Sequence, residues 1–178
     1  MIKIENRFFF ILAVLMASVV ALSNYLVQFP VSYLGLKDLL TYGAFSYPVA
    51  FLITDLANRR YGKNTAKKIV YLGFTLGLFL TLYFSTNYSN LISIRIAIGS
   101  GIAFLVAQLI DVNIFDKLRK KTWFVAPLIS SLIGSSIDTF LFFSIAFYGT
   151  KMNWVTLSIG DLTVKIFVAL MMLIPFRI

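Results

Sequence analysis

The chain has 178 residues, of which 60% are hydrophobic and 13% are charged, and its formal net charge is +9 at pH 7. An ordinary soluble domain carries about a quarter charged residues, so this composition excludes a soluble globule, and its hydrophobicity excludes a disordered chain. Cysteine and histidine are absent, which removes disulfides, the usual ligands of zinc, haem and iron–sulfur clusters, and the base of Ser-His or Cys-His catalysis.

We therefore expect a small membrane protein with no cofactor and no enzymatic activity. A bilayer core of about 30 Å needs about 20 apolar residues per helix. Six segments meet this requirement, at residues 8–29, 39–58, 68–87, 91–115, 124–148 and 154–176. The loops between them are too short for a further domain, so we expect residues 1–178 to form one all-α domain of six transmembrane helices.

The first segment also has features of a signal peptide, because Lys3 and Arg7 precede an apolar run that reaches Ser23. The apolar run continues to Phe29, however, which is beyond the short hydrophobic region of a typical signal peptide. We therefore expect an uncleaved first helix.

Lysine and arginine are concentrated in alternate loops, and cytoplasmic loops carry the positive excess. One side of the predicted topology holds Lys3, Arg7, Arg59, Arg60, Lys63, Lys67, Lys68, Lys117, Arg119, Lys120, Lys121 and Arg177. The other side holds only Lys37 and Lys151. We expect both termini in the cytoplasm of a multi-pass protein of the inner membrane. The basic loops indicate topology and contact with anionic lipid rather than binding of nucleic acid.

Several polar side chains fall inside the predicted spans, where an ionised group costs several kcal/mol unless it faces a partner or a water-filled cavity. With a rise of about 1.5 Å per residue, five of them from four helices lie in the outer half of the membrane. These residues are Asn24, Arg95, Asp138, Asp161 and Lys165. We expect them to meet in a cavity that opens to the outside.

Asp138 is the strongest candidate for a ligand or proton site, because its own helix offers no cation three or four residues away. Its neighbours in sequence suit a wet or hydrogen-bonded wall and are Ser130, Ser131, Ser135, Ser136 and Thr139.

The other four residues have structural alternatives. Asp161 and Lys165 are four residues apart and can neutralise each other on one helix face. Arg95 lies close enough to the surface to extend its charged end into water, and Asn24 can form a hydrogen bond between helices.

Two further acids, Asp55 and Asp111, lie near the cytoplasmic ends of the second and fourth spans. Asp55 is one turn before Arg59, and Asp111 precedes a basic loop. An ion pair or a gate is the role that we expect for them.

Four segments resemble a known family. They are YPVAFLITDLANRRYGKNTAKKIVYLGF at 47–74, AQLIDVNIFDKLRKKTW at 107–123, SSLIGSSIDTFLFFSIAFYG at 130–149 and WVTLSIGDLTVKIFVALMMLIPF at 154–176. This pattern is similar to that of the queuosine precursor transporters, the vitamin uptake transporter or YhhQ-like family of bacterial membrane proteins. One departure is that many relatives have Gln just before the Ile-Asp-Thr of the fifth span, where this chain has Ser135 and Ser136.

The resemblance implies an importer of queuosine precursors, which are 7-deazaguanines such as 7-cyano-7-deazaguanine, its 7-aminomethyl derivative or queuine, and an alternating-access mechanism. It also implies a fold like that of the six-helix substrate-binding subunits of energy-coupling-factor transporters, although this family is thought to work without their ATPase. A substrate-binding subunit of an ATPase-energised vitamin or nucleobase transporter is the alternative. The expected partners are a small-molecule deazapurine and membrane lipid, with no nucleic acid, and homo-oligomerisation stays open.

A guanine-like ring shows two hydrogen-bond donors along its Watson–Crick edge, and one carboxylate can accept both. Asp138 is our candidate for that carboxylate, with Asp161 as the second acid. Tyr47 or Trp154 can stack on the base, as can Tyr25, Tyr42 or Phe143. The remaining candidates are amides that can bind the carbonyl and ring nitrogens, and cations that can donate to the carbonyl or balance the acids: Asn24, Gln28, Gln108, Lys165 and Arg95.

Overall fold

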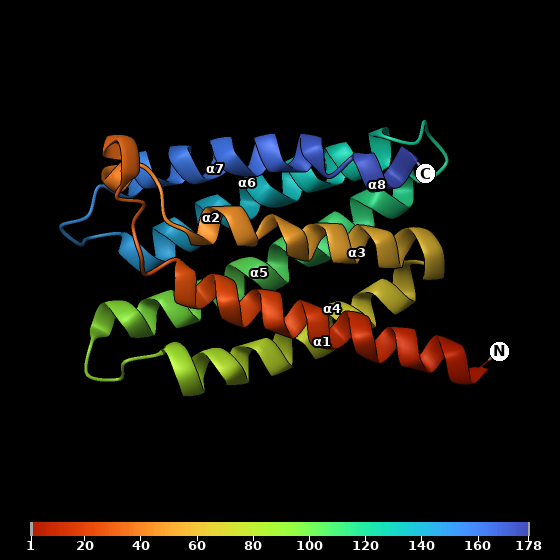
Figure 1. Cartoon of the computed structure of the whole chain (residues 1–178), viewed down its shortest axis with the longest axis horizontal. Coiled ribbons are helices and arrows are strands. Elements are labelled where there is room, and N and C mark those ends of the chain that lie inside the picture. Colours follow the sequence, from red (N-terminus) through yellow and green to blue (C-terminus); the bar gives the residue numbers. More distant parts are fainter. Residues whose placement is uncertain (1, 178) are drawn as a thin grey trace.

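The computed structural model describes residues 2–177, without the side chains of residues 2–6, 34, 38 and 85, so the side chain of Lys3 lies outside the described residues. Five long helices dominate the fold and run along its longest axis (Figure 1). They are α1 (Ile2–Leu26), α4 (Lys63–Leu80), α5 (Leu91–Leu118), α6 (Val125–Phe147) and α7 (Trp154–Met171). The shorter elements are the 3-10 helix η1 (Tyr33–Asp38), α2 (Gly43–Ser46), α3 (Pro48–Tyr61), the π-helix η2 (Thr81–Ser85) and α8 (Ile174–Arg177).

The expectation of an all-α membrane fold is confirmed, but the number of spans is confirmed only in part. Within residues 2–177, five helical stretches are long and apolar enough to cross a bilayer: Arg7–Leu26, Lys63–Phe84, Leu91–Leu118, Val125–Phe147 and Trp154–Arg177. The sixth predicted span, 39–58, is not among them, because the chain there is divided into α2 and α3.

Pro48 explains this division. Proline has no backbone N–H and cannot donate to the carbonyl four residues earlier, so α2 ends at Ser46 and Pro48 occupies the first turn of α3. The broken segment still runs alongside the long helices (Figure 1). Much of α3 is buried, including Phe51, Thr54 and Asp55, and Pro48 at the break is buried as well, whereas Ser46 and Tyr47 are half-buried.

Small residues allow the helices to pack closely. A Cβ added at Gly77 of α4 would lie 2.8 Å from Val20 Cβ of α1, and one added at Gly73 would overlap Met16. Met16, Val20 and Phe104 belong to a core cluster that joins α1, α3, α4 and α5. A second cluster, which includes Phe143 and Leu157, joins α5, α6 and α7.

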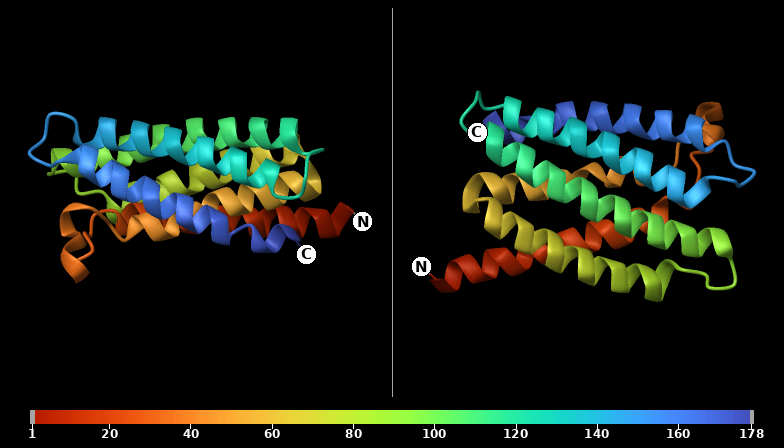
Figure 2. Two further views of the ribbon diagram at one scale, coloured as in Figure 1. Left: turned by 90° about the horizontal axis from the view of Figure 1, so that it is seen from above. Right: turned by 180° about the vertical axis from the view of Figure 1, so that it is seen from behind.

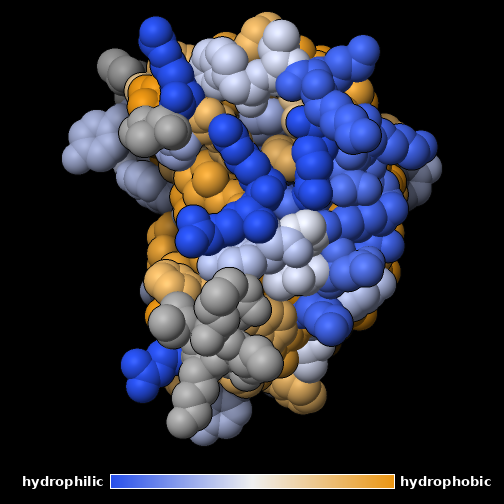
Figure 3. Space-filling model, turned by 90° about the vertical axis from the view of Figure 1, so that its right-hand side faces the viewer, coloured by the Kyte–Doolittle hydropathy of each residue, from blue (hydrophilic) through white to orange (hydrophobic). Residues whose placement is uncertain are grey.

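Both chain ends lie at the same end of the bundle (Figures 1 and 2). We call this the terminal end; it also holds the α3–α4 and α5–α6 connections, and the opposite end holds η1 and the loops before α5 and α7. Hydrophilic side chains gather on the terminal end (Figure 3). Exposed cations in its connections and on the adjoining helix turns include Arg60, Lys68, Lys117, Lys120 and Lys121.

Candidate functional site

A small cavity lies between four parts of the chain, where the broken helix passes the long ones. Its lining comes from the end of α1, from α2 and the residue that joins it to α3, and from α6 and α7. The lining residues are Asn24, Val27, Gly43, Tyr47, Asp138, Phe142, Asp161 and Lys165. Asn24, Tyr47, Asp138, Asp161 and Lys165 were all selected from the sequence, and the structure brings them together.

Lys165 of α7 is the centre of this cavity's polar network. Its Nζ lies 2.8 Å from Asp138 Oδ2 of α6 and 2.6 Å from Asp161 Oδ2, one turn earlier on α7. Lys165 Nζ also donates to Thr139 Oγ1 at 3.0 Å, and Thr139 Oγ1 donates to Asp161 Oδ2 at 2.7 Å. All four residues are buried, so the hydrogen bonds replace the hydration that these charges lose in the membrane.

The network holds two carboxylates against one ammonium group, which leaves an excess of one negative charge. Asp138 Oδ1 is buried and accepts no hydrogen bond from the described residues. The ring of Tyr47 lies beside the cluster, with Lys165 Nζ 5.2 Å from the ring centroid. The cavity therefore offers an acceptor oxygen and an aromatic face to a ligand that can donate hydrogen bonds.

The local sequence explains how these groups meet. Asp161 and Lys165 share one face of α7 because residues four apart are neighbours on a helix. Tyr47 reaches the cavity from the break before Pro48. Gly43 allows α2 to approach α1, since a Cβ there would lie 3.0 Å from Ser23 O and from Val27 Cα.

Asn24 is held at the edge of the cavity. Its Nδ2 donates to Thr81 Oγ1 at 2.9 Å, and Thr81 is the first residue of the π-helix η2. Such π-helical turns are rare overall, and those that occur are often found at functional sites. Asn24 therefore forms the hydrogen bond to another helix that we expected as its alternative role. Its side chain also lines the cavity.

A larger hollow of about 500 Å³ lies at the end of the bundle opposite the termini. We call it the vestibule; its lining residues are Val27, Gln28, Pro30, Lys37, Thr41, Phe147, Lys151, Met152, Asn153 and Leu157. Val27 lines both the vestibule and the cavity around Asp138, so the two are neighbours.

Seven candidates do not line the cavity; among the aromatic ones, Tyr25 and Tyr42 are exposed and Phe143 packs in the second core cluster. Arg95 donates to Ile145 O at 3.0 and 2.7 Å and to Tyr148 O at 2.8 Å, and so binds the last carbonyls of α6. A cation is favourable there because of the helix dipole. Trp154 begins α7 and lies 6.4 Å from Tyr148, ring to ring, where it packs on the apolar cluster of α5, α6 and α7.

The two glutamines also lie elsewhere. Gln28 lines the vestibule, and its Nε2 donates to Asn24 O at 3.3 Å. Gln108 is buried between α5 and α3, where Thr54 Oγ1 donates to Gln108 Oε1 at 2.5 Å.

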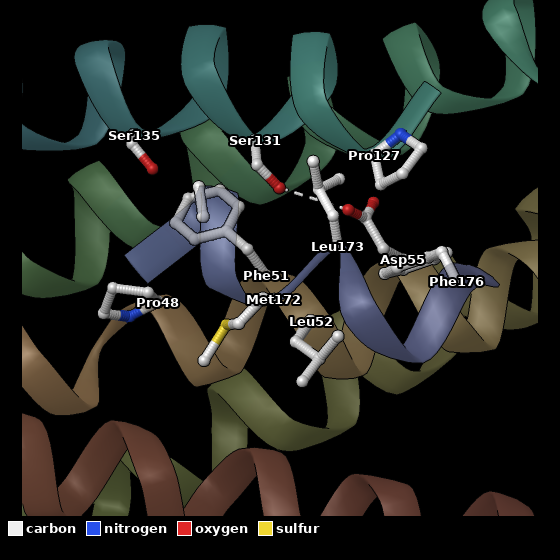
Figure 4. Close-up of a pocket in the computed structure, with 11 residues that line it drawn as sticks. Pro48, Phe51, Leu52, Asp55, Pro127, Ser131, Ser135, Met172, Leu173 and Phe176 are labelled. Carbon is white, nitrogen blue, oxygen red and sulfur yellow. Dashed lines mark hydrogen bonds between the residues drawn. The ribbon is translucent and has the colours of Figure 1, made fainter. Parts of the chain in front are cut away.

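The ion pair expected between Asp55 and Arg59 is not formed. Arg59 Nη1 instead donates to Phe176 O at 2.7 Å. Asp55 accepts hydrogen bonds from Ser130 at 3.4 Å and Ser131 at 3.1 Å, as Figure 4 shows for Ser131. Asp111 likewise pairs with no Lys or Arg among the described side chains. A spacing of one helical turn did not lead to an ion pair between Asp55 and Arg59, because the serines of α6 bind Asp55 and a carbonyl of α8 binds Arg59.

Sequence reasoning missed part of the lining. Val27, Gly43 and Phe142 carry no charge or amide that would distinguish them from packing residues. Thr139 was noted only as a neighbour of Asp138, although its hydroxyl joins Lys165 to Asp161. The spacing of residues within one helix cannot predict that Asp138 pairs with a cation from another helix.

Comparisons with known proteins agree on one family. Residues 41–178 match the model of the family described as "Putative vitamin uptake transporter". The "Probable queuosine precursor transporter" of Haemophilus influenzae is 35% identical over 88% of this chain and 79% of its own length. The "Queuosine precursor transporter" of Escherichia coli is 34% identical over the same shares, and the "Probable queuosine precursor transporter" of Bacillus subtilis is 29% identical over 75% and 68%. No solved structure matches. The chain belongs to the vitamin uptake transporter family.

Proposed function

We propose that this chain imports queuosine precursors and binds a 7-deazaguanine in the cavity around Asp138. The observation that carries the proposal is the buried Asp138 carboxylate, which lines a shared cavity and has an oxygen without a hydrogen bond from the described residues. Two relatives that match 88% of the chain are named for transport of queuosine precursors. The chain is accordingly a multi-pass membrane protein, of the inner membrane in bacteria, and not an enzyme.

Recognition follows from the chemistry of the base edge. A 7-deazaguanine presents its ring N–H and its exocyclic amine side by side, and one carboxylate can accept both. Asp138 Oδ1 is available for one of them, and Asp138 Oδ2 is held by Lys165. In the proposed complex Lys165 shifts toward Asp161 and can donate to the carbonyl of the base, while Tyr47 stacks on its face.

Transport also requires a change of shape. The cavity measures about 20 Å³, which is enough for one or two water molecules and too small for a bicyclic base. The vestibule of about 500 Å³ is separated from it at Val27. We infer alternating access in which the broken segment α2–α3 moves relative to α6 and α7, as discontinuous helices do in other transporters. The terminal end then faces the cytoplasm, and the vestibule faces outward.

The test is a binding panel of guanine, 7-cyano-7-deazaguanine, its 7-aminomethyl derivative and queuine on the purified protein in nanodiscs. We expect Asp138→Ala to weaken binding of the preferred base by about 10- to 100-fold, since a polar group on the ligand then loses its partner. The matched control is Ser136→Ala, because Ser136 is on the same helix but is exposed, and its hydroxyl bonds only Leu132 O. Full affinity of Asp138→Ala for every base would contradict the proposed site.

A second measurement separates the proposed importer from a subunit that needs an ATPase. Proteoliposomes that contain this chain alone should take up the preferred base. Binding without any uptake or exchange in such vesicles would favour the ATPase-dependent alternative.

A further inference from the structure

Two buried acids outside the proposed binding cavity are not used by the mechanism above. Asp55 of α3 is 1% exposed and Asp111 of α5 is 0% exposed. Hydrogen bonds on either side bring their helices together, since Thr54 donates to Gln108 and Asn58 Nδ2 donates to Val112 O at 3.0 Å. The two carboxyl groups also face the same turn of α6: a Cβ added at Gly134 would lie 3.3 Å from Asp111 Cβ, and the serine hydroxyls one turn earlier bind Asp55.

Nothing in their surroundings balances two negative charges. The face of α6 contributes the hydroxyls of Ser130 and Ser131, and the end of α7 and α8 contribute Met172, Leu173 and Phe176 (Figure 4). No Lys or Arg of the described side chains forms an ion pair with either acid.

The arginines at the neighbouring ends of α3 and α5 bind other groups. Arg59 binds Phe176 O, and Arg119 Nη2 binds Asn58 O as well as Asn58 Oδ1, the latter at 2.7 Å. Arg119 is also 3.6 Å from Asp116. Two adjacent carboxylates cannot both remain ionised in a buried site without a cation, so the pair must hold a proton.

Two observations bear on whether this proton can exchange. Both oxygens of Asp111 are fully buried and accept no hydrogen bond from any group among the described residues. A cavity of about 10 Å³, lined by Asp55, Ser131 and Ser135 among mostly apolar residues, adjoins Asp55 and has room for about one water molecule. Water in this cavity and the serine hydroxyls are the groups through which a proton would reach Asp55.

The same helices connect this pair to the cavity around Asp138. Ser131, Ser135 and Asp138 are buried on one face of α6, at spacings of four and three residues. Ser131 and Asp138 are thus about 10 Å apart along the axis. The helix α3 makes a second connection, since Tyr47 of the cavity precedes its first residue and Asp55 lies within it. A movement of α3 against α6 would therefore change both sites at once.

We propose that Asp55 and Asp111 form the proton-binding site that couples uptake of the base to entry of one proton. This inference rests on the proposed function. The proton binds from the outer side when the base does, and it is released to the cytoplasm when α3 separates from α6. With one neutral base per proton, a tenfold proton gradient can drive about a tenfold accumulation of the base.

The test uses two assays in proteoliposomes with the membrane potential held at zero. One measures accumulation of the base under a pH gradient, and the other measures exchange of internal for external base. Wild type should accumulate its preferred base about tenfold under a gradient of one pH unit and should lose this accumulation with a protonophore. Asp55→Asn and Asp111→Asn mimic the protonated carboxyl group, so each should retain exchange of internal for external base but lose the pH-driven accumulation. Retained exchange also shows that each variant is folded.

Asp116→Asn is the control, since Asp116 is on α5 but has a side chain that is 34% exposed and lies 3.6 Å from Arg119. It should accumulate the base like wild type. Tenfold accumulation by both Asp55→Asn and Asp111→Asn would overturn the inference, and so would wild-type accumulation that follows a sodium gradient instead. Exchange without any response to pH would reject the coupling alone, whereas no exchange of any base would reject the proposed function as well.

Discussion

Lys165 shows how single residues determine the chemistry of this membrane interior. Its side chain is only 3% exposed and lies within 2.8 Å of carboxylates from two helices. Burial of a charge is costly, and the arrangement is stable only while each member keeps its partners. The network therefore links α6 to α7 by electrostatics as well as by packing.

Lys165→Met is expected to destabilise the fold by about 3–5 kcal/mol, because it leaves two carboxylates buried without a cation. The free energy of unfolding in mixed micelles measures this effect. Adding Asp161→Asn to Lys165→Met should recover part of the loss, since one unpaired charge is then removed. Lys120→Met, at an exposed position, is the control and should change the free energy by less than about 0.5 kcal/mol. Equal stability of Lys165→Met and the control would contradict this account.

At the residue scale, four of the five polar side chains expected to meet do so, and Arg95 does not; the sequence did not fully predict how the four pair. Spacing within α7 identified Asp161 and Lys165 as partners, and that pair is formed. The bond from Lys165 to Asp138 depends on which faces of α6 and α7 meet, which helix periodicity cannot specify. Arg95 carries the same positive charge as Lys165, but its guanidinium group binds the last carbonyls of α6 and not the buried acids.

Among the elements, the division into α2 and α3 has the largest effect on the site. Hydrophobicity predicted one helix over 39–58, because apolar composition does not distinguish a continuous helix from a broken one. Pro48 was visible in the sequence, but the position of the break beside Asp138 and Lys165 is a property of the packed bundle. The other long helices followed from apolar length and were found close to their predicted bounds.

A close contact at α7 gives a test of how tightly the start of this broken segment is packed. A Cβ at Gly160 would overlap the backbone oxygen of Leu39, which cannot move as a flexible side chain can. Gly160→Ala should therefore destabilise the fold by about 1–3 kcal/mol in the same unfolding assay.

Gly101→Ala is the matched control in α5, where the added Cβ would lie 3.5 Å from Phe74 Cε2 in an ordinary contact. It should be neutral or stabilising by up to about 1 kcal/mol, because alanine favours helix more than glycine does. If the two variants were equally stable, the close approach of Leu39 to α7 would not hold.

For the whole molecule, alternation of charge predicted both termini on one side, and the two chain ends do lie at one end of the bundle (Figure 1). This arrangement fits an even number of crossings, with the broken segment α2–α3 as one of them. The expected likeness to energy-coupling-factor subunits stays a prediction, since no solved structure matches.

The orientation can be tested cleanly because the natural chain contains no cysteine. We expect a membrane-impermeant maleimide to label Lys151→Cys in intact cells and to label Lys120→Cys only after the membrane is permeabilised. Both positions are exposed and lie at opposite ends of the bundle, so each serves as the control for the other. Labelling of both from the same side would contradict the proposed topology.

The ammonium group between the two carboxylates has a further consequence for the protein at rest. It donates to carboxylate oxygens that the N–H groups of a base would bind in the proposed complex. Lys165 thus keeps one oxygen of each carboxylate paired, while Asp138 Oδ1 stays without a hydrogen bond from the described residues. Under the proposed function, this arrangement neutralises one of the two negative charges of the binding site while no base is bound.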